Sequence, residues 1–236
     1  MQLYFIRHGQ SRNNAHWDEP GFQPDPDPAL TESGSRQAQF LAGSLASLLP
    51  PSAIGAGTVS LYTSLMERAV QTAAPCARKL GLPLAALDIH ESGGIVGRQG
   101  EAEGIGLPGK PRSWFEGHFP ELALPPELDE SGWWNRPFET EDECQRRAGR
   151  VWTLILSRHA DRDSTPERQV VLFSHGGFFV HFLCAMLDLP WRQAAHGYKS
   201  WFLLNNCSIS RVDVRNGEVV VYALNRTAHL PDELIT

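Results

Sequence analysis

Short apolar runs alternate along the chain with longer segments of helical pattern, and this alternation constrains the fold more than any other feature. The strand-like runs lie at residues 2–6, 59–62, 84–89 and 169–174. The helical patterns between them cover about residues 31–49, 64–80 and 140–159. Strands that alternate with helices predict a mostly parallel sheet whose two faces are both covered.

The starts of these helical segments carry capping residues. Thr31 is an N-cap candidate, followed by a glutamate in the first turn, and a proline pair ends that helix. Ser64 to Glu67 and Thr140 to Glu143 both have the capping-box pattern of a hydroxyl residue followed three places later by a glutamate. The first box predicts a helix to about Leu80, and the second predicts a helix to about His159.

Two further segments complete the expected architecture. Residues 209–214 and 218–224 flank an Asn-Gly pair, which indicates a β-hairpin. Residues 93–137 are rich in glycine, proline and aromatic residues and are typical of an irregular cap insertion. We therefore expect one α/β domain over residues 1–236. It is a three-layer sandwich with a mostly parallel central sheet, helices on both faces, a C-terminal hairpin and a cap at 93–137.

Composition narrows the range of partners. The formal net charge of −6 does not favour nucleic acid or an anionic membrane as the main partner. The four cysteines are scattered without metal-ligand spacing, which favours free thiols in a reducing compartment. The N-terminus opens into a strand-like run without a cleavable leader, and the apolar stretch at residues 178–189 is too short to span a bilayer. We expect a cytoplasmic protein with no nucleic-acid and no membrane partner.

Polar clusters follow the predicted strands, where open α/β sheets place their ligand crevices. In chain order they are Arg7 to Ser11 with Asn14, Arg68 in the first turns of the second helix, His90 to Gly94, and Ser174 to Gly177. The carboxyl ends of parallel strands meet at one edge of a sheet. These clusters are therefore expected to converge although they are far apart in the sequence.

The side chains in these clusters suit phosphoryl transfer. The guanidiniums of Arg7 and Arg68 can hold phosphate oxygens with bidentate hydrogen bonds. His8 can attack phosphorus as the neutral imidazole, and nearby positive charges lower its pKa and so favour that form. Gly9 and Gly176 let the backbone approach closely, and the helix after the second histidine offers free N–H groups to an anion.

The leaving group of a phosphate ester also needs a proton donor, and the same group can later deprotonate the attacking water. Glu91 is our choice, with Asp88 and Glu101 in reserve. Its glycine-rich, apolar surroundings would allow a raised pKa.

The order of these pieces resembles a known family. Residues 3–11, with Asn14 following, resemble the signature of the histidine phosphatase superfamily, the phosphoglycerate mutase-like proteins. Three later segments are similar, in the same order, to the helix after that signature, to the second-arginine segment and to the second-histidine segment: residues 30–38, 62–73 and 173–177. The likeness covers residues 1–92 and 140–225, which is most of the chain.

The resemblance implies a role for each matching residue. It implies His8 as the nucleophile, and Arg7, Arg68 and His175 as phosphate ligands that stabilise the transition state. It also implies a supporting phosphate contact from Asn14, and neither a metal nor another cofactor.

Two positions depart from the family pattern. Many members carry glutamate after the signature glycine, where this chain has Gln10. The true mutases continue after their carboxylate with Tyr-Gly and Gln-Gly pairs, where this chain has Glu91-Ser92-Gly93-Gly94-Ile95. The second departure favours a phosphatase over a glycolytic mutase.

We therefore expect a metal-independent phosphatase that hydrolyses a small phosphorylated substrate through a covalent phosphohistidine on His8. Two alternatives stay open: a phosphoglycerate-mutase-type phosphotransferase, and a non-catalytic protein that binds a phosphorylated ligand. Trp114, Trp133 and Trp134 either recognise the substrate or pack the insertion onto the body. The sequence leaves a homodimer open and does not identify the natural substrate.

Overall fold

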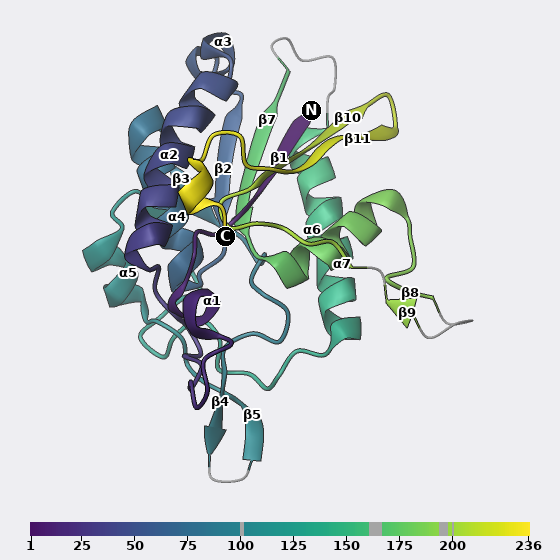
Figure 1. The fold of residues 1–236 in the computed structure, drawn as a ribbon. Helices are drawn as coiled ribbons and strands as arrows, with labels where there is room; N and C mark the ends of the chain where they lie inside the picture. The colour runs from purple at the N-terminus through teal and green to yellow at the C-terminus, as the bar shows by residue number, and fades with distance from the viewer. Residues whose placement is uncertain (100–101, 161–166, 194–197, 200) are drawn as a thin grey trace.

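A central β-sheet with helices against both faces forms the body of the protein in the computed structural model (Figure 1). The structure describes residues 1–99, 102–160, 167–193, 198–199 and 201–236. The main sheet has seven strands in the order β11-β10-β1-β7-β2-β3-β6, and the strands from β1 to β6 in that order are mutually parallel. The α/β class and the mostly parallel sheet predicted from the sequence are confirmed.

The strands of this sheet follow the apolar runs of the sequence. In sheet order their bounds are Glu218–Arg226, Ile209–Arg215, Gln2–Arg7, Gln169–Ser174, Val59–Thr63, Leu84–Ala86 and Leu122–Ala123. Two small ribbons lie outside it, β4 (Val96–Gln99) with β5 (Ala102–Gly106) and β8 (Arg192–Gln193) with β9 (Tyr198–Lys199). β7 lies between β1 and β2 and is buried along its whole length, because helices cover both faces of the sheet there.

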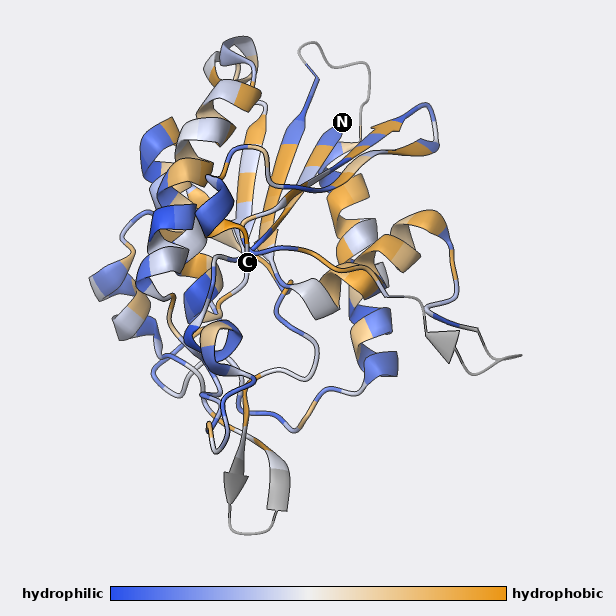
Figure 2. Ribbon diagram, viewed as in Figure 1, coloured by the Kyte–Doolittle hydropathy of each residue, from blue (hydrophilic) through white to orange (hydrophobic). Residues whose placement is uncertain are grey.

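Helices form the outer two layers. Their bounds are α1 Arg12–His16, α2 Glu32–Leu48, α3 Pro51–Gly55, α4 Glu67–Leu80, α5 Arg112–His118, α6 Glu141–His159 and α7 Gly176–Leu187, with a 3-10 turn at Asp232–Leu234. α2 and α4 pack against each other on one side of the sheet, and α6 and α7 do so on the other (Figure 1). Figure 2 shows that the central strands and α7 are mostly hydrophobic, while polar residues mark the outer faces of the other helices. No helix within the described ranges has the length and apolarity needed to cross a membrane.

β1 shows how a single strand serves both layers. Tyr4 and Ile6 belong to the buried apolar cluster under α2 and α4, whereas Leu3 and Phe5 belong to the cluster under α6 and α7. Successive side chains of a strand point to opposite faces, so a strand covered on both faces must be apolar at each of these positions.

Two of the three predicted helix starts are confirmed and the third is wrong. Thr31 caps α2, and Thr140 opens α6 in a capping box. α4 begins only at Glu67, and its N-cap residue provides no side-chain cap, so the box predicted from Ser64 does not form. The Ser64 hydroxyl instead lies 2.7 Å from Nε2 of the His175 imidazole.

The C-terminal hairpin forms around the predicted turn. β10 and β11 pair in antiparallel fashion on either side of Asn216 and Gly217, whose φ values are 52° and 79°. A type I′ turn requires positive φ at both central positions, which Asn and Gly tolerate. Because β10 also pairs with β1, the hairpin extends the sheet at its antiparallel edge.

The segment at residues 93–137 contains β4, β5, α5 and β6. Phe115, Leu122 and Leu128 from this segment are buried in the cluster under α2 and α4, and β6 joins the main sheet beside β3. Ile95 and Trp134 pack on a methionine just before α4. Part of the segment thus contributes to the core, and its separate standing as a cap within one domain stays a prediction.

Candidate active site

Adjacent strands end side by side and bring the predicted residues together. Arg7 at the end of β1 pairs in register with Ser174 at the end of β7. The next residues, His8 and His175, therefore leave the sheet together, and their ring centroids lie 5.1 Å apart. Arg68 reaches the same place from the first turn of α4, with its Nε 3.1 Å from His8 Nε2. All three are buried, with 2%, 0% and 8% of the surface of His8, His175 and Arg68 exposed.

Hydrogen bonds fix which ring nitrogen of His8 carries the proton. Nδ1 lies 2.7 Å from the carbonyl oxygen of Gly9. A carbonyl oxygen can only accept, so Nδ1 carries the hydrogen and donates it. Nε2 keeps its lone pair, which accepts a hydrogen bond from Arg68 Nε. Nε2 is therefore the nitrogen able to act as a nucleophile.

Burial and positive neighbours keep both imidazoles neutral. The pKa of His8 lies well below the ordinary value of 6.5, because of burial first and then the charges of Arg68 and Arg7. The pKa of His175 is also well below 6.5, again through burial first and then through Arg68. The sequence predicted the effect of the arginines, and the structure adds burial as the larger cause.

Ser64 fixes the proton of the second histidine. Its Oγ lies 2.7 Å from His175 Nε2 and 3.4 Å from the backbone nitrogen of Met66. The Met66 N–H donates to this hydroxyl, and the hydroxyl's own proton is available for donation to His175 Nε2. With that hydrogen bond made, the proton of His175 is on Nδ1, which is buried and has no hydrogen-bond partner among the described residues.

Arg7 presents a second donor of this kind. One of its terminal nitrogens donates to the carbonyl of Leu204, whereas its Nε is buried and has no partner in the described part of the chain. A buried N–H that lacks a partner costs about 1–3 kcal/mol. An anion bound beside His8 would give partners to both Arg7 Nε and His175 Nδ1.

Close backbone packing holds the loop that carries His8. A Cβ at Gly9 would lie 2.7 Å from the carbonyl oxygen of Gly34 in α2, and one at Gly34 would lie 2.1 Å from the carbonyl oxygen of Gln10. A side chain at either position would push the loop away from α2. The Gly9 N–H also donates to Thr72 Oγ1 at 2.9 Å, which ties the loop to α4. In the structure the lack of a Cβ at Gly9 therefore lets the backbone of this loop pack closely against α2.

Asn14 lies in α1 at the exposed rim of this loop. Its Oδ1 accepts from the Ser11 backbone N–H in a capping box and from Asn206 Nδ2, both at 3.2 Å. Asn206 also donates to the carbonyl of His8 at 3.0 Å. The Asn14 oxygen is thus used to fix the loop, and its Nδ2 is the group suited to a phosphate oxygen.

Glu91 lies against the first turn of α7. Its Oε1 accepts from the backbone N–H of Ser92 at 2.9 Å and from that of Phe178 at 3.0 Å. A Cβ at Gly177 would lie 2.4 Å from this oxygen, whereas a Cβ at Gly176 would meet only Arg7 Nε at 3.7 Å. Gly177 is therefore the position in this Gly-Gly pair that has no room for a Cβ.

The reserve carboxyls differ from Glu91. Asp88 Oδ1 lies 3.1 Å from His90 Nε2 and 3.6 Å from Arg136 Nη2. Burial raises the pKa of Asp88, but the hydrogen bond from His90 and the charges of His90, Arg147 and Arg136 outweigh it and hold the pKa at about 2. A carboxylate with so low a pKa is a poor proton donor near neutral pH. Glu101 lies outside the described residues.

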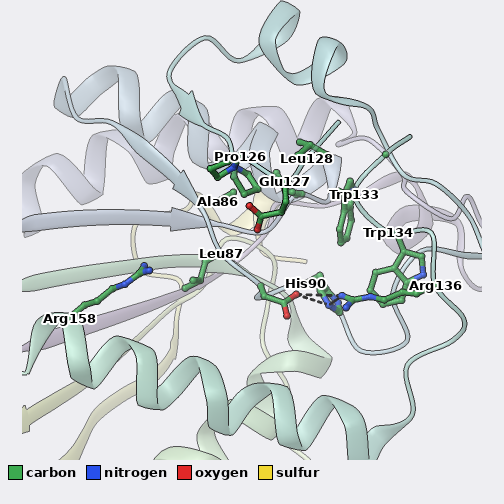
Figure 3. Close-up of a pocket in the computed structure, with 14 residues that line it drawn as sticks. Ala86, Leu87, His90, Pro126, Glu127, Leu128, Trp133, Trp134, Arg136 and Arg158 are labelled. Carbon is green, nitrogen blue, oxygen red and sulfur yellow. Dashed lines mark hydrogen bonds and ion pairs between the residues drawn. The ribbon is translucent and has the colours of Figure 1, made fainter. Parts of the chain in front are cut away.

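A cavity of about 580 Å³ opens beside the segment after β3 (Figure 3). Asp88 and His90 line it from that segment, and Trp133, Trp134 and Arg136 line it from the insertion. Arg136 stacks on Trp134, with Cζ 4.1 Å from the ring centroid. Neither His8 nor His175 lines this cavity, so Asp88 and Glu91 face different surroundings although they are three residues apart. Across the described ranges, no three His, Cys, Asp or Glu side chains gather as a metal ion would require.

Several residues of the site have no sequence feature that predicts their contacts with the two histidines or with Arg68. Ser64 has the position of a helix cap, and Asn206 lies in a segment with no predicted role. Asp27 lies in a loop rich in proline and aspartate, yet its Oδ1 accepts from the backbone of Glu67 at 2.9 Å and lies 4.0 Å from Arg68 Nη1. Burial raises the pKa of Asp27 to about 6, although Arg68 lowers it.

Comparison with known proteins gives a family match over nearly the whole chain. The model of the histidine phosphatase superfamily (branch 1) matches residues 3–227. A search of curated proteins gives no match.

Several solved structures share the fold. A phosphoserine phosphatase mutant from Entamoeba histolytica, in complex with phosphoserine, is 18% identical over 98% of this chain and 99% of its own, with a TM-score of 0.59. A mycobacterial glucosyl-3-phosphoglycerate phosphatase in complex with inorganic phosphate is 19% identical, with coverages of 98% and 99% and a TM-score of 0.60. YhfR of Bacillus stearothermophilus is 21% identical, with coverages of 97% and 98% and a TM-score of 0.57.

Proposed function

The chain belongs to the histidine phosphatase superfamily, and we propose that it hydrolyses a small phosphomonoester through a covalent phosphohistidine on His8. One observation carries the proposal. The lone pair of His8 Nε2 adjoins a site where Arg7 Nε and His175 Nδ1 are buried donors without partners among the described residues. In-line attack on a bound phosphoryl group needs a nucleophile beside hydrogen-bond donors that are available to the phosphate oxygens.

The first half-reaction forms the phosphoenzyme. His8 Nε2 donates its lone pair to phosphorus, the N–P bond forms, and the ester P–O bond on the opposite side breaks. The departing alkoxide takes a proton from Glu91, which becomes a carboxylate. Arg7, Arg68 and the Nδ1–H of His175 hold the non-bridging oxygens, where negative charge lies in the transition state.

The second half-reaction regenerates the enzyme. A water molecule gives a proton to the Glu91 carboxylate as its oxygen attacks phosphorus, and the N–P bond breaks. Inorganic phosphate leaves, His8 Nε2 regains its lone pair, and Glu91 is again protonated. Every group returns to its starting state, so this chemistry needs no additional reactant.

In this scheme Arg68 also controls when the lone pair of His8 Nε2 becomes available for attack. Its Nε donates to His8 Nε2 at 3.1 Å, so the nucleophilic lone pair is engaged before substrate binds. A phosphate dianion is a stronger acceptor for a guanidinium than a neutral imidazole is. Binding of the phosphate would transfer the Arg68 hydrogen bonds to its oxygens and free Nε2 for attack.

The substrate class follows the chemistry of the site and of similar proteins. Two of the structural neighbours are phosphatases named for phosphoserine and for glucosyl-3-phosphoglycerate, both of them small phosphorylated molecules. We place this chain's substrate in the same broad class, a phosphate monoester of a small polar molecule. Asn14 Nδ2 and the first-turn N–H of Gly176 are further contacts proposed for the phosphate.

Turnover of p-nitrophenyl phosphate tests the proposal. His8→Ala should lower kcat by at least about 1,000-fold, because the nucleophile is lost. His118→Ala, at an exposed histidine of α5, is the matched control and should retain full activity. Wild-type protein quenched with alkali during turnover should carry a phosphoryl group that acid removes, whereas the His8 variant should carry none.

Two outcomes would contradict the proposal. Tight binding of vanadate without hydrolysis of any phosphoester in a broad panel would favour the phospho-ligand binding protein. Loss of activity in EDTA, restored by a divalent cation, would point to metal-dependent chemistry in place of the phosphohistidine route.

A further inference from the structure

Arg147 in α6 is a buried charge that the proposed reaction does not use. Only 1% of its surface is exposed. Its Nε and Nη2 donate to the two carboxylate oxygens of Glu139 at 2.7 Å and 2.6 Å. A buried ion pair is a poor device for stability alone, since an apolar pair of similar volume often serves as well or better. Its contacts show a different use.

The contacts of this pair converge on the segment that carries Glu91. Arg147 Nη1 donates to the carbonyl of Asp88 at 3.1 Å, three residues before Glu91. The backbone N–H of Glu139 donates to the carbonyl of Gly93 at 3.1 Å, two residues after Glu91. Hydrogen bonds from Arg147 and Glu139 therefore hold the two ends of the short segment at residues 88–93.

A third contact reaches the carboxylate through α7. The Arg147 guanidinium lies over the ring of Phe178, with Cζ 4.6 Å from the centroid. The backbone N–H of Phe178 is one of the two that hold Glu91 Oε1, at 3.0 Å. The Arg147 side chain thus contacts Asp88 at the start of the Glu91 segment, and Glu139, which holds the end of that segment. It also contacts Phe178, whose backbone N–H binds the Glu91 carboxylate.

We propose that Arg147, with Glu139, is a positioning residue that sets the place of the Glu91 carboxyl for proton transfer to the leaving group. This inference rests on the proposed function, in which Glu91 is the proton donor. Arginine suits the task because its planar fork can hold a carboxylate with two nitrogens while a third donates to a carbonyl. Lysine keeps the charge but lacks this fixed geometry.

Leaving-group dependence separates positioning from mere structural support. An alkyl phosphate releases a strongly basic alkoxide, which needs a proton from Glu91 as the P–O bond breaks. p-Nitrophenyl phosphate releases a weakly basic phenolate that departs without one. kcat/KM covers the steps up to phosphoenzyme formation and leaves out the hydrolysis step that both substrates share. A misplaced acid therefore lowers kcat/KM for alkyl phosphates alone, whereas partial unfolding lowers it equally for both substrates.

The test compares five variants with wild type on an alkyl phosphate and on p-nitrophenyl phosphate. Arg147→Lys should lower kcat/KM for the alkyl phosphate by about 10- to 100-fold, since a displacement of about 1 Å can cost that much. It should change kcat/KM for the aryl phosphate by less than about threefold. Glu139→Gln keeps its backbone N–H and should act in the same direction with a smaller loss. Should Arg147→Lys not fold, Glu139→Gln carries the test.

Two controls lie on the same helix. Val151→Ala removes a buried side chain one turn after Arg147 and should lower thermal stability while leaving the alkyl-to-aryl rate ratio unchanged. Arg150→Lys alters an exposed arginine and should change neither quantity. An unchanged rate ratio in both Arg147→Lys and Glu139→Gln would overturn the inference.

Glu91→Gln keeps a failure of this inference apart from a failure of the proposed function. If wild type forms no phosphohistidine, the proposed function fails. If Glu91→Gln lowers kcat/KM equally for both substrates, Glu91 is not the proton donor and the inference falls with that assignment. If Glu91→Gln selectively slows the alkyl phosphate and the two pair variants do not, the proposed function stands and only the role of Arg147 is wrong.

Discussion

One imidazole of the site presents a lone pair and the other presents an N–H hydrogen, because the two rings have different hydrogen-bond partners. His8 donates from Nδ1 to a backbone carbonyl and so presents a lone pair at Nε2. His175 lies 2.7 Å from the Ser64 hydroxyl at Nε2, and it presents a hydrogen at Nδ1 when that hydroxyl donates to it. One ring is prepared to attack phosphorus and the other to donate to a phosphate oxygen. The neutrality of both rings, through their lowered pKa values, is what allows this division.

Ser64→Ala tests the proton assignment of His175. Without the hydroxyl, Nε2 of His175 loses its donor and the ring can hold its hydrogen on either nitrogen. We expect kcat for p-nitrophenyl phosphate to fall by about one to two orders of magnitude, through loss of a preorganised phosphate contact. Ser64→Thr keeps the hydroxyl and should restore most of the rate, while Ser47→Ala on the exposed side of α2 should have no effect. Equal rates for the alanine and threonine variants would contradict the assignment.

Gly177→Ala tests the seat of the Glu91 carboxylate. The new methyl group would lie 2.4 Å from Glu91 Oε1 and 2.5 Å from the hydroxyl of Ser92, so the carboxylate must leave the first turn of α7. We expect a loss of at least about tenfold in kcat for an alkyl phosphate, measured at saturating substrate. Gly149→Ala, in α6 where nothing lies within 4 Å, should keep full activity and stabilise the protein by up to about 1 kcal/mol.

Asp27→Asn should exchange activity for stability. The pKa of Asp27 rises from 3.8 to about 6 on folding, so its contribution to stability is complete below pH 3.8 and is lost as pH rises through 6. At pH 7.5 an asparagine, which cannot ionise, should raise the free energy of unfolding by up to about 3 kcal/mol. At pH 3.5 the gain should vanish. Denaturant unfolding at both pH values measures the difference.

The same variant should lower kcat/KM, because the carboxylate that faces Arg68 is lost while the acceptor for the Glu67 N–H remains. Asp18→Asn, at an exposed aspartate earlier in the same loop, is the control for a general effect of charge. A gain in stability that did not depend on pH would show that Asp27 does not titrate as its burial requires.

At the scale of elements, helix starts separate what the sequence encodes locally from what it does not. The starts of α2 and α6 were predictable because each capping hydroxyl bonds within its own first turn. The start of α4 was not, since Ser64 and His175 are 111 residues apart and no local pattern signals their contact. A hydroxyl before a helix can serve the helix or a distant partner, and only the packed fold decides which.

Thr140→Ala tests this difference between the two hydroxyls. Thr140 accepts from the Glu143 N–H and belongs to a box that opens α6, so its loss should lower the free energy of unfolding by about 1 kcal/mol. Turnover should not change, because the box lies on the exposed face of the helix start. Ser64→Ala should show the opposite pattern, a large loss of rate. Similar profiles for the two variants in unfolding and kinetic assays would contradict this division.

At the scale of the molecule, the fold class and the order of the four polar clusters could be predicted, because strand alternation and strand ends are features of local sequence. The partners that complete the site could not. Asn206 reaches the carbonyl of His8 from 198 residues away, and Asp27 reaches α4 from a loop without regular structure. The burial that lowers the pKa of His8 also arises only once the helices have packed. Convergence and the effect of the arginines on the pKa of His8 were predictable, whereas the larger effect of burial and the ring nitrogen that carries the proton were not.

The insertion supplies the last prediction at this scale. Phe115, Leu122 and Leu128 lie in the same buried cluster as Val171 of the central strand, and β6 pairs directly with β3. Breaking these contacts would expose the α2 and α4 side of the core, so residues 93–137 and the body should unfold together. We expect one calorimetric transition whose enthalpy equals the van't Hoff enthalpy.

Replacing residues 93–137 with a short linker should remove that transition, because it exposes an apolar face that β6 and α5 otherwise cover. Replacing only residues 97–105, which include most residues of β4 and β5, is the matched control. It leaves both Ile95 and the packed residues in place and should preserve cooperative unfolding. A folded, cooperative protein lacking all of 93–137 would show instead that the insertion is a separable unit added to a complete core.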